Sequence, residues 1–142
     1  MQSLVFTLTR TVLAAALFGA SMAASAATIE VRVQGVVGGK GKVLVAVCDK
    51  STFLKDCAYS ASAPAQQGET VVTVNDVPAG TWAVLSYQDE NDNGKLDRNV
   101  IGIPKENYGF SRDARGRFGP PSFEDAAFSL QNEPVVTNVK LR

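Results

Sequence analysis

Short segments in which apolar and polar residues alternate constrain the fold of this chain more than any other feature. In residues 29–33, Ile29, Val31 and Val33 fall on one side, and the polar residues between them fall on the other. This two-residue period is typical of a strand with one buried face. Further strand-like segments, bounded by glycine and proline turns, cover residues 42–48, 69–74, 81–88, 123–130 and 135–141. We therefore expect an all-β fold, a small antiparallel β-sandwich of about six or seven strands.

The residues between these segments predict how the strands are connected. Glycines at residues 38–41 predict a tight reversal that joins the first two strands as an antiparallel hairpin. Residues 49–68 are expected to form a polar connection, in which Ser51 could cap a short helical turn ending near Lys55. Residues 98–122 carry many glycines and prolines and predict a long irregular loop. Connections of this length inside a compact domain are usually functional or mobile.

The N-terminal residues have the pattern of an export signal. Arg10 precedes an apolar run at residues 11–20, and Ala24, Ser25 and Ala26 form a small-residue cleavage site. A retained membrane anchor is the alternative, but it would be expected to need about 20 uninterrupted apolar residues. We expect residues 1–26 to be a cleaved signal peptide and residues 27–142 to be a single domain. The protein is then periplasmic or secreted, with no membrane insertion after cleavage.

Composition limits the functions open to this chain. Its 14 basic and 14 acidic residues give a formal net charge of +0, which provides no electrostatic reason to expect nucleic acid as a partner. The chain has no histidine, so it lacks the usual base of Ser-His and Cys-His nucleophile pairs. We expect a protein that is not an enzyme. The alternative is an enzyme that acts through the acidic residues at 89–97, which would require a cleft beside Asp89 and Asp97.

The chain has two cysteines, Cys48 and Cys57. In an exported protein an even number of cysteines favours a disulfide, here tying the end of a strand to the loop after it. Two buried or reactive thiols are the alternative.

The stretch from Asp89 to Asp97 has the spacing of a loop that binds a hard cation. Side-chain oxygens stand at its first, third, fifth and ninth positions (Asp89, Asn91, Asn93 and Asp97), and the sixth position is a glycine. The backbone carbonyl of Lys95 would complete the set. Because all these ligands are oxygens, we expect Ca²⁺.

Two features qualify the calcium hypothesis. The twelfth position is Val100, where a calcium hand has a bidentate glutamate, although Glu106 could enter from the following loop. We therefore expect weak binding, on the order of 10⁻⁵–10⁻³ M. The alternative is a turn without metal, since Asp, Asn and Gly are also the preferred turn formers.

Two kinds of partner are suggested by aromatic residues. A set of aromatic and arginine side chains, which we name the aromatic–arginine surface, could contact an envelope protein, because such residues anchor interfaces. The alternative is that its aromatics fold back over the open end of the sandwich. A glycan is the second candidate partner, stacking on Trp82, Tyr87 or Tyr108, although Trp82 is expected in the core with its indole N–H hydrogen-bonded. The aromatic–arginine surface consists of Tyr108, Phe110, Arg112, Arg115 and Phe118.

Several motifs in a fixed order resemble one bacterial family. Residues 77–84 (VPAGTWAV) are followed by residues 89–97 (DENDNGKLD), 102–106 (GIPKE), 109–111 (GFS) and 123–128 (FEDAAF). This order resembles the bacterial secreted proteins grouped as domain of unknown function 2141. The resemblance covers nearly all of the predicted mature chain and implies an exported, single-domain β-sandwich, similar to prealbumin-like or immunoglobulin-like modules. It implies no activity.

Overall fold

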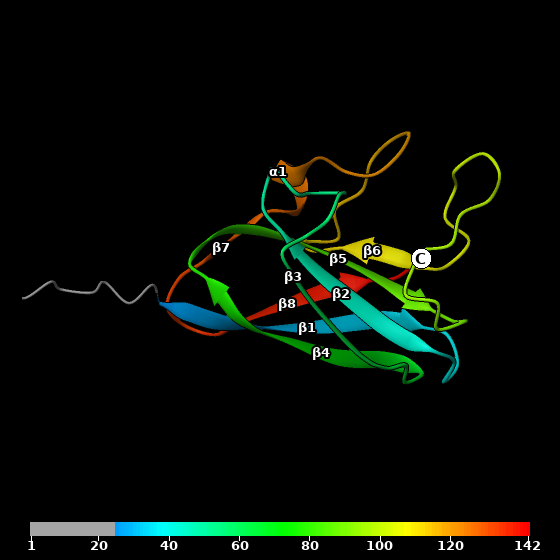
Figure 1. Cartoon of the computed structure of the whole chain (residues 1–142), viewed down its shortest axis with the longest axis horizontal. Coiled ribbons are helices and arrows are strands. Elements are labelled where there is room, and N and C mark those ends of the chain that lie inside the picture. Colours follow the sequence, from blue (N-terminus) through cyan, green and yellow to red (C-terminus); the bar gives the residue numbers. More distant parts are fainter. Residues whose placement is uncertain (1–24) are drawn as a thin grey trace, which may run out of the picture.

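The computed structural model describes residues 25–142, so most of the predicted signal peptide lies outside the described residues. In these residues eight strands form two sheets, and one short helix lies in the connection between β6 and β7 (Figure 1). The first sheet has the order β4-β1-β8, and the second has the order β3-β2-β5-β6, with β7 also paired to β5. In chain order the elements are β1 (Ala26–Val36), β2 (Lys42–Cys48), β3 (Tyr59–Pro64), β4 (Gly68–Pro78), β5 (Gly80–Asp89), β6 (Tyr108–Phe110), α1 (Phe123–Ala126), β7 (Phe128–Leu130) and β8 (Val135–Lys140).

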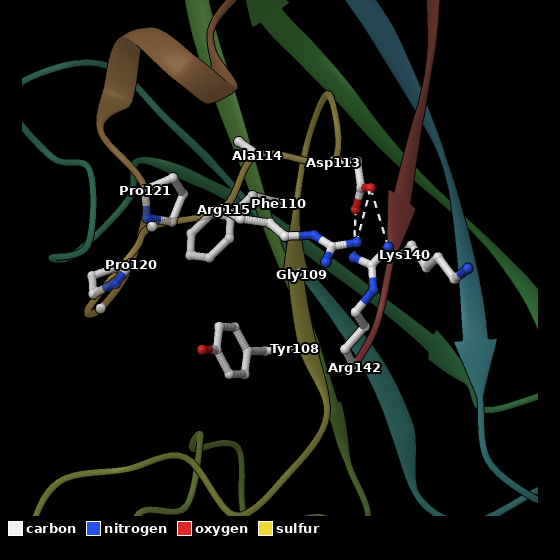
Figure 2. Close-up of a pocket in the computed structure, with 12 residues that line it drawn as sticks. Tyr108, Gly109, Phe110, Asp113, Ala114, Arg115, Pro120, Pro121, Lys140 and Arg142 are labelled. Atoms are coloured by element: carbon white, nitrogen blue, oxygen red, sulfur yellow. Dashed lines mark hydrogen bonds and ion pairs between the residues drawn. The ribbon is translucent and has the colours of Figure 1, made fainter.

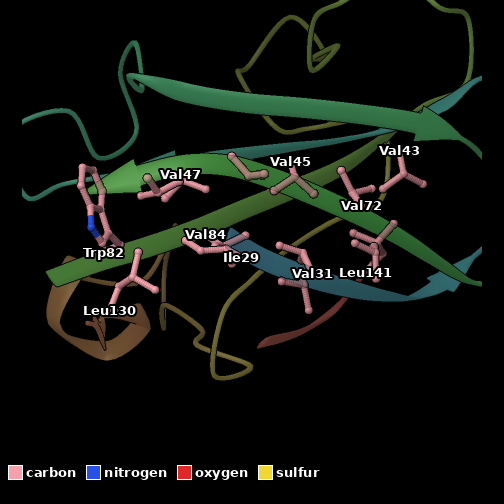
Figure 3. Close-up of a cluster of buried hydrophobic side chains, with 14 of the residues drawn as sticks. Ile29, Val31, Val43, Val45, Val47, Val72, Trp82, Val84, Leu130 and Leu141 are labelled. Atoms are coloured by element: carbon pink, nitrogen blue, oxygen red, sulfur yellow. The ribbon is translucent and has the colours of Figure 1, made fainter. Parts of the chain in front are cut away.

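The main core lies between the two sheets, and alternation along the strands fills it. Ile29 and Val31 of β1 face Val45 and Val47 of β2, and all four side chains are buried (Figure 3). Trp82 closes one end of this core, where its indole nitrogen donates to the carbonyl of Pro78 at 2.8 Å. The all-β sandwich and the core position of Trp82 are confirmed.

Two features of the predicted topology are wrong. β1 and β2 do not form a hairpin, because residues 38–41 carry the chain from one sheet to the other. The fully buried Gln88 fixes this crossing: its amide accepts from Val37 N at 2.9 Å and donates to the carbonyls of Val37 and Lys40 at 2.8 and 3.1 Å. The sandwich is also not purely antiparallel, since β8 runs parallel to β1.

Three segments have a different local structure from the one predicted. Residues 49–68 contain β3, whose inner side chains pack against the main core. Their first part forms hydrogen-bonded turns, in which the carboxylate of Asp49, rather than Ser51, accepts from Thr52 N at 2.9 Å. Residues 123–130 begin as α1, capped by Ser122, and only the last three form a strand. The long connection after residue 97 includes the short strand β6.

A smaller core covers the outer face of the second sheet. Phe53, Phe110 and Ala126 pack there with Cys48 and Ala83. The disulfide between Cys48 and Cys57 closes this core and confirms the predicted pairing. No helix among residues 25–142 is long and apolar enough to cross a membrane.

Removing the disulfide is expected to lower the free energy of unfolding by about 2.5–3 kcal/mol, because a cross-link between residues 9 apart restricts the unfolded chain. Urea unfolding of the Cys48→Ala/Cys57→Ala double variant measures this loss. Wild-type protein treated with reductant is the matched comparison and should lose a similar amount. Equal stability of the oxidised protein and the double variant would contradict the prediction.

Candidate metal centre

The predicted ion-binding residues span the last residue of β5 and the mostly exposed turn that follows it, which we name the acidic loop (residues 89–97). Asp89 is the last residue of β5 and is fully buried. Its two carboxylate oxygens accept from the backbone N–H groups of Asn93 at 3.1 Å and Gly94 at 2.7 Å. Among residues 25–142, no lysine or arginine forms an ion pair with Asp89. The first position of the loop is therefore a buried carboxylate that is satisfied by backbone dipoles alone.

Two side-chain amides bind Asp97, at the other end of the loop. Asn91 Nδ2 donates to Asp97 Oδ2 at 2.6 Å, and Asn93 Nδ2 donates to Asp97 Oδ1 at 2.8 Å. These hydrogen bonds, that from Asn93 first, hold the pKa of Asp97 below its ordinary value. The four predicted side-chain ligands thus form one connected group rather than pointing apart into solvent.

The orientation of the two amides matters for metal binding. Asn91 Oδ1 accepts from Asn93 N at 3.3 Å and Asn93 Oδ1 accepts from Lys95 N at 2.9 Å, which are Asx-turn bonds that need no metal. Rotating each amide by about 180° would instead direct its oxygen at the Asp97 carboxylate. Oxygens facing one another in this way repel unless a cation lies between them.

Glu106 follows the acidic loop in sequence and hydrogen-bonds to both ends of the loop. The side chain is buried, and its two oxygens accept from Glu90 N and from Asp97 N, each at 3.1 Å. Glu106 was predicted only as a ligand that could enter the site, and this anchoring role was missed. Its position 17 residues after Asp89, across an irregular connection, gives no periodic signal that places it beside the loop.

The acidic loop combines carboxylate oxygens with amide and backbone oxygens. Residues 25–142 contain no group of three or more His, Cys, Asp or Glu side chains placed to hold a metal ion. A cation in the acidic loop would therefore depend on Asn91, Asn93 and the Lys95 carbonyl as well as on Asp89 and Asp97. Such a set suits a hard cation and gives no softer ligand for zinc or copper.

Tyr87 shows the negative potential around this loop. Its hydroxyl donates to the carbonyl of Gly94 at 3.2 Å. Burial raises the pKa of Tyr87, and the carboxylates of Asp89, Glu106 and Asp97 raise it further. Of the three predicted stacking residues, Tyr87 is hydrogen-bonded to the loop, Trp82 packs in the core, and Tyr108 lines a cavity.

A hydrogen-bonded hairpin follows directly, which we name the aliphatic hairpin (residues 97–105). Asn99 organises its tip: Oδ1 accepts from Ile101 N at 3.1 Å and Ile103 N at 2.9 Å, and its own N–H donates to the Ile103 carbonyl at 2.8 Å. Val100, Ile101 and Ile103 nevertheless face solvent. The predicted irregular loop is thus ordered here by local hydrogen bonds, and its exposed aliphatic tip was not predicted.

The aromatic–arginine surface is divided by the structure. Phe110 is buried in the smaller core, as the packing alternative expected, whereas Phe118, in the connection of residues 112–121, is 97% exposed. Tyr108, Phe110 and Arg115 line one cavity. Arg112 is exposed and donates to the carbonyl of Ala127 at 3.1 Å. Figure 1 shows the connections before and after β6 projecting beyond the sheets.

Comparison with known proteins identifies the family of this chain. No curated protein and no solved structure matches it. The model of the family described as "Uncharacterized protein conserved in bacteria (DUF2141)" matches residues 31–138. The match runs from within β1 to within β8 and includes the acidic loop, the aliphatic hairpin and β6. The chain therefore belongs to this family of uncharacterised bacterial proteins, DUF2141.

Proposed function

We propose that this protein is a non-enzymatic, calcium-stabilised module of the bacterial envelope, exported through its N-terminal signal peptide. Ca²⁺ bound by the acidic loop orders the surface that contacts another macromolecule. The observation that carries the proposal is the connected group formed by Asp89, Asn91, Asn93 and Asp97. The ligands are the side chains of these four residues and the Lys95 carbonyl.

The electrostatics of the loop support a cation. Asp89 and Glu106 are both buried carboxylates, and no lysine or arginine of residues 25–142 forms an ion pair with either. Buried carboxylates usually have a cationic partner or a metal. A bound Ca²⁺ would supply this charge.

The aliphatic hairpin supports a role in contact. Its tip is ordered by hydrogen bonds, yet it exposes Val100, Ile101 and Ile103. A preorganised apolar tip binds a partner at a smaller entropic cost than a flexible one. Because the Lys105 N–H donates to the Asp97 carbonyl at 2.8 Å, ordering of Asp97 by calcium also fixes the base of the hairpin.

Thermal melting with added calcium tests the proposal. At about 10 mM Ca²⁺, a site in the expected affinity range should stabilise the fold by roughly 1.5–4 kcal/mol and raise Tm by about 5–15 °C. Asp97→Ala should reduce this rise to below about 1 °C, because it removes a ligand. Glu90→Gln is the matched control, since it removes one charge from an exposed position of the same loop and should keep the rise.

Equal Mg²⁺ concentrations control for ionic strength and should give a smaller rise, because Mg²⁺ requires a stricter octahedron. No change in Tm with Ca²⁺, or an equal loss of the effect in Glu90→Gln and Asp97→Ala, would contradict the proposal.

A further inference from the structure

A cavity of about 190 Å³ lies beside β6 and is not lined by any residue of the acidic loop. Residues of β6, of the connection at 112–121 and of the C-terminal end form its walls (Figure 2). Known ligand pockets of roughly 300–1,000 Å³ hold drug-sized molecules, so a cavity of this size fits a molecule with a single ring.

Close backbone contacts hold two walls of this cavity together. Tyr108 and Arg142 exchange two backbone hydrogen bonds, at 3.2 and 3.1 Å, which join β6 to the end of the chain. A Cβ at Gly109 would lie 2.2 Å from the Lys140 carbonyl oxygen, and one at Gly116 would lie 2.0 Å from the Gly119 carbonyl oxygen. These close approaches, together with Pro120 and Pro121, fix the floor and the outer wall.

One side of the cavity carries positive charge. Arg142 donates to both carboxylate oxygens of Asp113, with Nη2 3.1 Å from Oδ2, and Arg115 Nη2 lies 3.3 Å from the same Oδ2. Figure 2 shows both guanidinium groups converging on Asp113. The two arginines and Asp113 give this wall a net charge of +1, and the Lys140 side chain points away from the cavity (Figure 2).

Asp113 keeps the guanidinium groups in place at neutral pH. The hydrogen bond from Arg142 is the largest of the effects that lower the pKa of Asp113 to about 2, and Arg115 contributes. Both arginines are therefore held before any ligand arrives, which reduces the ordering cost of binding. The two guanidinium groups together carry more positive charge than the Asp113 carboxylate neutralises, so an anion can still be attracted.

The other side of the cavity is apolar and aromatic. The rings of Tyr108 and Phe110 stand edge to face with centroids 6.0 Å apart, and Pro120 and Pro121 lie opposite them. A planar ring or the C–H face of a sugar can pack on Tyr108. The cavity thus places a flat apolar surface beside a fixed pair of guanidinium groups.

We propose that this cavity binds a small carboxylate carried on a single six-membered ring, with the ring packed on Tyr108 and the carboxylate held by Arg115 and Arg142. An aromatic acid and a uronic acid share this chemistry. Guanidinium groups suit the ligand because they bind carboxylates through paired, charge-assisted hydrogen bonds. The site uses none of the predicted calcium ligands, so its test is independent of the calcium proposal.

Amide chemical-shift titration of the purified protein tests the proposal, with Gly109 and Gly116 as reporters. The ligands are 4-hydroxybenzoate and glucuronate, and the controls are phenol, glucose and acetate. We expect at least one of the two acids to bind with Kd on the order of 0.1–1 mM, as suits about ten non-hydrogen atoms. Phenol, glucose and acetate should bind at least about tenfold more weakly, because each lacks either the charge or the ring. The tighter of the two acids identifies the source of the ligand.

Matched arginine variants make the test specific. Arg115→Gln should weaken binding by about tenfold or more. Arg117→Gln removes the same charge two residues away, where it does not line the cavity, and should change Kd less than about twofold. Equal weakening by both variants or equal binding of the neutral rings would overturn the proposal. So would no binding of either acid at about 5 mM, a concentration several times the upper end of the expected Kd range.

Discussion

Gly41→Ala is expected to lower the free energy of unfolding by about 4 kcal/mol or more, a large part of the total stability of a domain of this size. A Cβ at Gly41 would lie 1.8 Å from the carbonyl oxygen of Asp89 and 2.9 Å from Cα of Glu90. Both neighbours are backbone atoms and cannot rotate away. Gly41 also has a φ of +68°, where a side chain adds strain. Urea unfolding measures the loss.

Gly38→Ala separates these two effects. Gly38 has a similar φ of +61°, but the nearest atom to its added Cβ would be Lys40 Cγ at 4.0 Å. This variant should cost about 1–2 kcal/mol, the strain of the left-handed conformation alone. If Gly41→Ala lowers the free energy of unfolding no more than Gly38→Ala does, then Gly41 does not lie as close to the Asp89 carbonyl as the structure places it.

Glu106→Ala is expected to cost about 3–5 kcal/mol and to abolish the stabilisation by Ca²⁺. The substitution leaves the N–H groups of Glu90 and Asp97 without their charged acceptor, and each such bond contributes roughly 1.5–3 kcal/mol. Without Glu106 the two ends of the acidic loop separate, so the ligands no longer meet. Urea unfolding measures both effects when it is done with and without about 10 mM Ca²⁺, the concentration used in the melting experiment.

Two further variants control for this change. Glu133→Ala removes a carboxylate from an exposed turn and should change stability by less than about 0.5 kcal/mol. Glu106→Gln keeps one carbonyl oxygen as acceptor and should fall between the wild type and Glu106→Ala. A Glu106→Ala protein as stable as Glu133→Ala would exclude the anchoring role.

The strands were predictable from sequence where one face alone is buried. Alternation in β1 and β2 places Ile29 and Val45 in the core, and both lie there. The partner of each strand was not predictable in the same way, because alternation fixes which face is buried and not which neighbour is bonded. The fully buried Gln88 decides the crossing between sheets, yet in sequence it is one polar residue at the end of a strand.

The acidic loop was predictable because its residue types stand at fixed spacing within nine positions. Asp89, Asn91, Asn93 and Asp97 do form one group, although calcium itself stays a prediction. The contacts that come from far along the chain were not predictable. Glu106 reaches the loop across the aliphatic hairpin, and Arg142 meets Asp113 from 29 residues away. Local spacing carries no information on such pairs.

The parallel pairing of β1 with β8 has a consequence for biogenesis. β1 lies between β4 and β8, so its second edge stays open until a strand from the far end of the chain arrives. Contacts between such distant segments form slowly, because a long loop must close first. A nascent or truncated chain without β8 would expose the backbone of β1 to other chains, and chaperone protection would matter most during that interval.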